Sequence, residues 1–271
     1  MALPALGLDE AVRLTGLIAA IGIAYDAVEL YLARRELLER FFDWRVIRSR
    51  YYILIDRPVL SLVFDVLFAG RLFVWAMVAH GVAALLFPIV FPYSRAAGAL
   101  LAGLVLCVHC LSNVRLLIGR DGADQMQTVV WAGLFLYCLP LTPTAQIVSV
   151  AFIGVQLVLS YMISGIAKVI SPVWRDGSAI GLITRMATYC SPGLSRMLGR
   201  RVVSRCVSWA TMLFEIGSPF LLLAGRPGAM AMIVLGTAFH VGIAVAMGLT
   251  TFVFAFLATF PILYHFAGRV S

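Results

Sequence analysis

Long apolar segments follow one another along almost the whole chain, and short charged connections separate them. A helix that crosses a bilayer needs about 20 mostly apolar residues, and lipid leaves helices or closed barrels as the spanning structures. Hydrophobic residues make up 62% of the chain and charged residues 13%, against about one quarter in a typical soluble domain. We therefore expect an all-α, polytopic integral membrane bundle of about eight transmembrane helices. The candidate spans are approximately 14–33, 60–90, 96–118, 127–143, 147–169, 207–224, 229–247 and 249–267.

The second segment, 60–90, is longer than one upright helix needs, so we expect it to tilt, to kink or to begin as an interfacial helix. Before the first apolar segment the chain is acidic, with Asp9 and Glu10, and it lacks the basic region of a cleavable signal peptide. We expect the first span to remain in the mature protein. No internal repeat and no soluble second domain is apparent, which predicts a single transmembrane domain over 1–271.

The net charge of +8 is concentrated in two connections, 34–57 and 170–206. Cytoplasmic loops carry an excess of arginine and lysine, so we expect both connections to be cytoplasmic and both termini to lie on the other side. The first reads as a basic amphipathic interfacial segment, because basic and apolar-aromatic residues alternate over 34–50. In the second, Pro192 and Gly193 divide 178–205 into two short helices. Nucleic-acid binding would need aromatic residues interleaved on a soluble module, so the bilayer is the expected partner.

Lys168 is the only lysine in the chain, and it lies near the end of the fifth span. A lysine at bilayer depth costs about 2.5–3.5 kcal/mol to insert, so it usually faces a cavity or a partner. A buried lysine can give up its proton and act as a base, whereas arginine effectively cannot. Tyr161, Ser164, Gly165 and Lys168 share one helical face by their spacing. A lysine that extends to the membrane boundary is an equally good interpretation of the residues alone.

Several other ionisable residues lie inside or beside the predicted spans, and most of them are expected to form structural ion pairs or hydrogen bonds. Asp124 stands at the entrance to the fourth span, where it could cap the helix. Arg71 is expected to find a carboxylate on another helix. Cys107 and Cys110 are expected to pack as small residues, since CxxC within a helix is a weak redox signal. The others are Asp26, Glu29, Asp65, Glu215 and His240.

Four sequence pieces in order resemble the HTTM family, the transmembrane domains related to vitamin K-dependent gamma-glutamyl carboxylase. YMISGIAKVISPVW resembles the family's Y-x-x-x-G-x-x-K-x-x-x-x-x-W signature, and FHVGIAVAMGLTTFVFAFLA its F-H-x-x-x-A-x-x-M-G-L pattern. NVRLLIGRDGADQ and FEIGSPFLLL are the other two pieces. The resemblance implies that Lys168 is the base that deprotonates a vitamin K or menaquinol-like quinol, and that His240 belongs to the same catalytic site.

Two departures from the carboxylase refine this expectation. A second catalytic histidine of the carboxylase falls near Asp124, where bacterial members often carry aspartate. The large lumenal domain of the carboxylase has no counterpart in this chain, which instead resembles short bacterial relatives of the sporulation-delaying protein B type. The resemblance thus implies a bacterial cytoplasmic membrane protein concerned with a peptide. The carboxylase works on the lumenal side, whereas the arginines place Lys168 near the cytoplasmic end of its helix, and the side of the site stays open.

Two functions remain from the sequence. In the first, Lys168, His240 and Asp124 are catalytic in modification of a peptide, and Tyr161, Ser164, Trp174 and Glu215 line a pocket for a quinol-like cofactor. In the second, the protein is a non-catalytic membrane partner in maturation or export of a secreted peptide toxin. A cavity beside Lys168 would favour the first, and a lysine packed directly against Glu215 without a void would favour the second. No metal site is expected.

Overall fold

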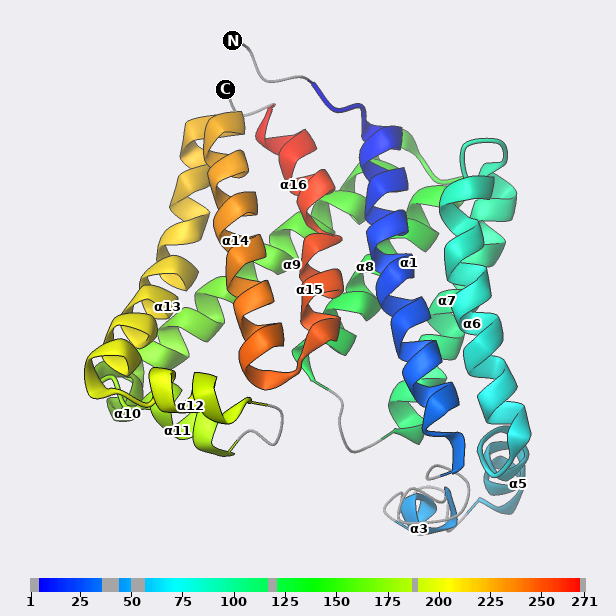
Figure 1. Ribbon diagram of the computed structural model, residues 1–271. Helices are drawn as coiled ribbons and strands as arrows, with labels where there is room; N and C mark the ends of the chain where they lie inside the picture. Colours follow the sequence, from blue (N-terminus) through cyan, green and yellow to red (C-terminus); the bar gives the residue numbers. More distant parts are fainter. Residues whose placement is uncertain (1–4, 36–43, 50–56, 117–120, 187–189, 269–271) are drawn as a thin grey trace.

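Figure 1 shows a computed structural model of the protein, which describes residues 5–35, 44–49, 57–116, 121–186 and 190–268. Within these ranges every regular element is a helix. The expected all-α membrane bundle is therefore confirmed.

Six stretches of the described residues are long and apolar enough to cross a membrane. They are Leu8–Leu32 (α1), Arg71–Val90 (α6), Arg95–Arg115 (α7), Pro143–Ile170 (α9), Arg201–Met247 and Thr250–Ala267. The fifth stretch folds back on itself as α13 (Arg201–Leu221), η1 (Leu222–Ala224) and α14 (Gly225–Met247), and the sixth is divided into α15 (Thr250–Leu257) and α16 (Phe260–Ala267). α8 (Gly122–Cys138) is shorter, with 17 residues, and packs against α7 and α9. The expected number of eight spans is thus approximate.

Small residues allow the amino-terminal half to pack closely. α1 buries Ala19 and Ala20 completely where it meets α6, its main neighbour. Small side chains let helix backbones approach in a membrane, where lipid provides no hydrophobic driving force. The ring of Phe87 from α6 then meets Trp131 of α8 edge to face, with centroids 5.5 Å apart. This core lies beside the cavity described below.

The long segment 60–90 divides into two helices, α5 (Pro58–Phe68) and α6, with Gly70 in extended conformation between them. Asp65 on α5 forms an ion pair with Arg48 of α3 (Trp44–Arg48), and Trp44 donates its indole N–H to the same carboxylate at 2.7 Å. Arg71 begins α6 in an exposed position and has no ion pair among the described residues. Its position at a helix end removes the need for the intramembrane carboxylate that we expected.

The cysteine expectation is corrected in the same part of the chain. Cys107 and Cys110 are both free and exposed on α7. They lie on the outer face of the helix, so they do not serve as small packing residues in the core.

The arginine-rich connections lie at one end of the bundle. Figure 1 shows α3, α10 (Pro172–Arg175), α11 (Ala179–Met186) and α12 (Pro192–Leu198) at this end, with the start of α1 and the end of α16 at the other. The two short helices expected in 178–205 are present, and Pro192 begins the second. The amphipathic helix expected over 34–50 falls mostly on 36–43 and residue 50, which lie outside the described residues. The arrangement agrees with the expected topology, whose cytoplasmic assignment stays a prediction.

Candidate functional site

A cavity of about 1270 Å³ lies between α8, α9, α13, α14 and α15, and its lining is mostly apolar. Short helices α10, α11 and α12 supply the lining at the arginine-rich end. Six of the seven residues expected at the site line this cavity: Tyr161, Ser164, Lys168, Trp174, Glu215 and His240. Lys168 and Glu215 are the only aspartate, glutamate, lysine or arginine residues among those that line the cavity. The cavity therefore has one charged point in an apolar wall.

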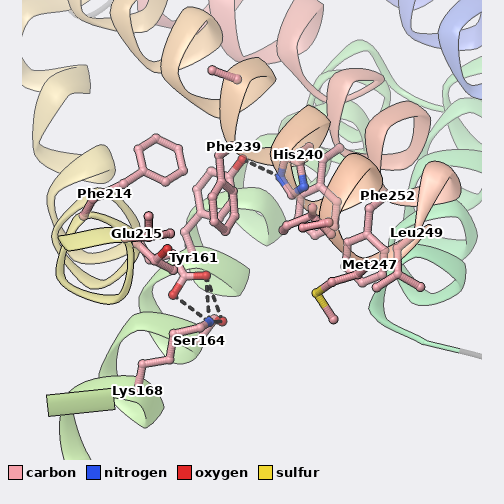
Figure 2. A pocket seen from close by; sticks show the side chains of 18 of the residues that line it. Tyr161, Ser164, Lys168, Phe214, Glu215, Phe239, His240, Met247, Leu249 and Phe252 are labelled. Atoms are coloured by element: carbon pink, nitrogen blue, oxygen red, sulfur yellow. Dashed lines mark hydrogen bonds and ion pairs between the residues drawn. The ribbon is translucent and has the colours of Figure 1, made fainter. Parts of the chain in front are cut away.

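Lys168 of α9 forms a direct ion pair with Glu215 of α13. The Lys168 Nζ lies 2.8 Å from both carboxylate oxygens, and the two side chains are 18% and 4% exposed. The ammonium also donates to the Ser164 hydroxyl, which donates to Glu215 Oε1 at 3.1 Å. Figure 2 shows the three groups converging at one side of the cavity. A buried carboxylate without a cation would be very unfavourable, so this pair satisfies both partners.

A close approach of α9 and α13 makes this pair possible. A Cβ atom at Gly165 would lie 2.7 Å from Ile216 Cγ1, 3.0 Å from Glu215 Cβ and 3.1 Å from the Ile216 amide nitrogen. No side chain fits there, because real Cβ contacts are rarely so short. Gly165 thus sets the helix separation at which Lys168 reaches Glu215.

Tyr161 of α9 and His240 of α14 form a second polar group of the cavity lining. Tyr161 Oη and His240 Nε2 are 3.0 Å apart and share a hydrogen bond, and each residue is 2% exposed. The Phe256 ring stacks on the imidazole at a centroid distance of 4.2 Å. The other imidazole nitrogen, Nδ1, has no hydrogen-bond partner among the described residues. The histidine is therefore held in the wall of the cavity by Tyr161 and Phe256.

Trp174 lines the cavity beside the lysine, with the Lys168 Nζ 5.2 Å from the centre of its ring. The turn that follows is fixed on α13. Gly177 has φ +81°, in the left-handed region, and a Cβ there would lie 2.5 Å from Arg205 Cα. Ser204 accepts the Gly181 N–H at 3.0 Å and donates to the Gly177 carbonyl at 2.6 Å.

Outside the membrane segments, Asp176 accepts hydrogen bonds from the hydroxyl and the amide of Ser178. These bonds hold the pKa of Asp176 below its ordinary value. The carboxylate therefore stays ionised and keeps the turn folded beside the basic residues at the start of α13.

Asp124 does not line the cavity, although its neighbours Gly122, Gln125 and Met126 do. We expected that Asp124 could cap α8, but it is not the N-cap. Asp121 is the N-cap, and Asp124 accepts the Asp121 N–H at 3.1 Å from the third helical position, which completes a capping box. Both aspartates lie near the start of the helix, and the sequence does not show which of them has the backbone angles of an N-cap residue.

A cavity beside Lys168 was expected to favour catalysis, and direct packing of Lys168 against Glu215 was expected to favour a structural role. The structure has both features. Lys168 packs directly against Glu215, as a structural cation would, and the pair also borders a large cavity. In the described part of the chain, no group of three histidine, cysteine, aspartate or glutamate side chains is placed to hold a metal ion. The arrangement can accommodate an apolar molecule with a polar head at the ion pair.

Sequence reasoning missed the residues that position this site. Gly165 was one small residue on the lysine's face, and Ser204 was an unremarked serine between arginines. The available signal for Gly165 was its place within YMISGIAK, one turn before the lysine. Ser204 offered no comparable signal.

One comparison with known proteins matches the part of the chain that contains Lys168, Glu215 and His240. The model of the HTTM domain family matches residues 142–267, from the N-cap of α9 through α16. The match includes three of the four motif pieces, and NVRLLIGRDGADQ precedes it. None of the curated proteins and none of the solved structures matches the chain. The carboxy-terminal part of this integral membrane protein is therefore similar to the HTTM domain.

Proposed function

We propose that the protein is an enzyme of the bacterial cytoplasmic membrane that binds a quinol-like molecule in the cavity and uses Lys168 as a base in modifying a peptide. The observation that carries the proposal is the placement of the chain's only lysine, with its carboxylate partner, on the wall of a large apolar cavity. The whole chain 1–271 then acts as one HTTM-like domain, of the short type that resembles sporulation-delaying protein B.

The residues present fit a quinol. Ring-sized apolar space adjoins the ion pair of Lys168 and Glu215, whose polar atoms can receive a hydroxyl group. Ligand sites of this kind combine mostly apolar walls with a few placed polar groups. When bound, a quinol would supply a weakly acidic hydroxyl and two electrons.

The ion pair can prepare Lys168 to act as a base. Transfer of one proton from the ammonium to Glu215, 2.8 Å away, converts two buried charges into a neutral amine and a neutral acid. Exclusion of water favours the neutral forms, because burying charge is unfavourable. The free amine at Lys168 could then accept a proton from a hydroxyl within hydrogen-bond reach. Ser164 keeps both side chains in position during the exchange.

The test is Lys168→Arg in full-length protein held in lipid nanodiscs. Arginine keeps the positive charge beside Glu215 but effectively cannot release its proton. Oxygen consumption with added naphthoquinol is the measurement, because loss of a proton makes a quinol reduce oxygen faster. We expect the variant to stay folded while its consumption falls to the protein-free background. Full consumption by a folded Lys168→Arg protein would rule out the base.

One observation favours a second candidate, a non-catalytic membrane partner in peptide-toxin maturation or export. The direct pair between Lys168 and Glu215 joins α9 to α13, which is what a purely structural pair would do. In that case wild type and Lys168→Arg would both match the background in the quinol assay. The two proteins would also support peptide maturation equally when each is produced with the native partner.

A further inference from the structure

α13 and α14 diverge from the turn that joins them, as Figure 1 shows. Six residues of these two helices both line the cavity and are exposed. We take them as the border of an opening between the helices and call them the α13–α14 mouth: Ala210, Leu213, Leu235, Ala238, Gly242 and Val245. Leu213 is 67% exposed and Leu235 50% exposed. At 1.5 Å per residue, Ala210 and Ala238 lie about 17 and about 20 Å along their helices from the turn, well inside the bilayer.

Apolar side chains of α11 and α12 line the arginine-rich end of the cavity, which we call its floor. Ile183 of α11 and Leu194 and Leu198 of α12 line the cavity there. α11 is held on α13 through Ser204, and α12 on α11 by the hydrogen bond from Ser195 Oγ to the Thr184 carbonyl at 3.1 Å. An apolar molecule can therefore reach the bilayer through the mouth without crossing this floor.

The charged groups that line the cavity determine which kind of polar head group a bound molecule can have. Glu215 neutralises Lys168, and no other aspartate, glutamate, lysine or arginine lines the cavity. An anionic head group would have to leave water without a free cation to receive it, which is unfavourable. A neutral head with hydroxyl or carbonyl groups can instead form hydrogen bonds with the ion pair and with Ser164.

Building on the proposed function, we propose that the cavity takes a neutral amphiphile dissolved in the bilayer, with its head at Lys168 and its apolar tail leaving between α13 and α14. Gly242 is the position at which this geometry is most open to change. A Cβ there would meet no atom within 4 Å, so a larger side chain fits the fold and fills the mouth. Val241, the adjacent residue, is 43% exposed and does not line the cavity, which makes it the matched control.

The experiment compares phylloquinone, which carries a long apolar tail, with menadione, which has the same ring and no tail. Full-length protein in phosphatidylcholine nanodiscs is titrated with each, and quenching of tryptophan fluorescence is followed. Naphthoquinones quench indole, and a Trp174→Phe background identifies the signal from the cavity. We expect Gly242→Phe to weaken phylloquinone binding at least tenfold and to leave menadione binding unchanged. Val241→Phe should change neither.

Ala210→Phe, on the opposite edge of the mouth, should show the same selective loss, which guards against a fold defect peculiar to Gly242→Phe. If wild type binds both quinones and the mouth variants lose neither, or lose both equally, the lateral exit is wrong and the quinol site stands. If wild type binds neither quinone, the proposed quinol function fails together with this inference. Displacement of phylloquinone by an equal concentration of palmitate would overturn the preference for a neutral head.

Discussion

The Lys168 ammonium lies equidistant from the two carboxylate oxygens of Glu215, at 2.8 Å from each, and this contact joins α9 to α13. Lys168 stands on the face of α9 that meets α13, and Glu215 is almost completely buried. The pair is therefore both a helix contact and the only charged feature of the cavity lining.

The pair predicts an asymmetric response to mutation. Glu215→Leu should destabilise the protein by about 3–5 kcal/mol, since it leaves the partly buried Lys168 ammonium without its counter-ion. The double variant Lys168→Met with Glu215→Leu should be much closer to wild type, because no charge is left unpaired. Unfolding in mixed detergent micelles with increasing sodium dodecyl sulfate measures both. Additive losses in the double variant would show that the two side chains do not depend on each other.

Gly165→Ala should destabilise the bundle by about 1–3 kcal/mol, as overpacking does when the neighbouring backbone has to move. The new methyl group would meet the Ile216 amide and the Glu215 Cβ. Gly154→Ala is the matched control on the same helix, because its Cβ would meet a single atom, Leu263 Cδ1 at 3.9 Å. The same unfolding measurement should leave Gly154→Ala unchanged or slightly more stable, given the higher helix propensity of alanine. Equal effects at the two positions would contradict a special role for Gly165.

Gly177→Ala should loosen the turn that follows Lys168. Alanine at φ +81° pays about 1–2 kcal/mol of backbone strain, and its methyl group would collide with Arg205. Limited proteolysis should then cut within 175–205 faster than in wild type. Gly193→Ala, in open space on α12, should be cleaved at the wild-type rate. A Gly177→Ala protein as resistant as wild type would show that the turn tolerates a side chain.

The topology can be tested by labelling single cysteines in intact cells, in a background without the five native cysteines. A cysteine at Arg200, at the arginine-rich end, should be protected from a membrane-impermeant maleimide added outside. A cysteine at Tyr93, which is 89% exposed in the turn between α6 and α7, should be labelled. The reverse pattern would invert the orientation and place the cavity floor outside the cell.

The sequence predicted the helices better than their contacts. Apolar length located the spans because lipid demands continuous helical hydrogen bonding, and Pro192 marked a real helix start. The excess length of 60–90 indicated an interruption, but the sequence analysis did not locate it at Gly70. Lys168 was expected near Glu215, His240 or Asp124, and Glu215 is the partner in the structure. Nothing in the order of residues states how closely α9 and α13 approach, since that distance depends on which face of each helix meets the other.

Asp124 shows the same limit at another position. Its place at the start of α8 was visible in the sequence, but its direction was not. The side chain turns back to the Asp121 amide and away from the cavity, because a capping box satisfies a backbone donor at the helix start. By the resemblance, Asp124 stands where the carboxylase has its second catalytic histidine. Among the described residues, no side chain on the cavity wall takes the place of that histidine.

The distance of 47 residues between Lys168 and Glu215 has a consequence for synthesis of the protein. At about 5–20 residues per second, the ribosome makes α9 some 2 to 10 seconds before the counter-ion of its lysine exists. Lys168 stands two residues before the end of α9, so its ammonium can extend to the lipid headgroups during this interval. We therefore expect the fifth span to insert before its partner exists, and α13 to bring the charge inward when it arrives.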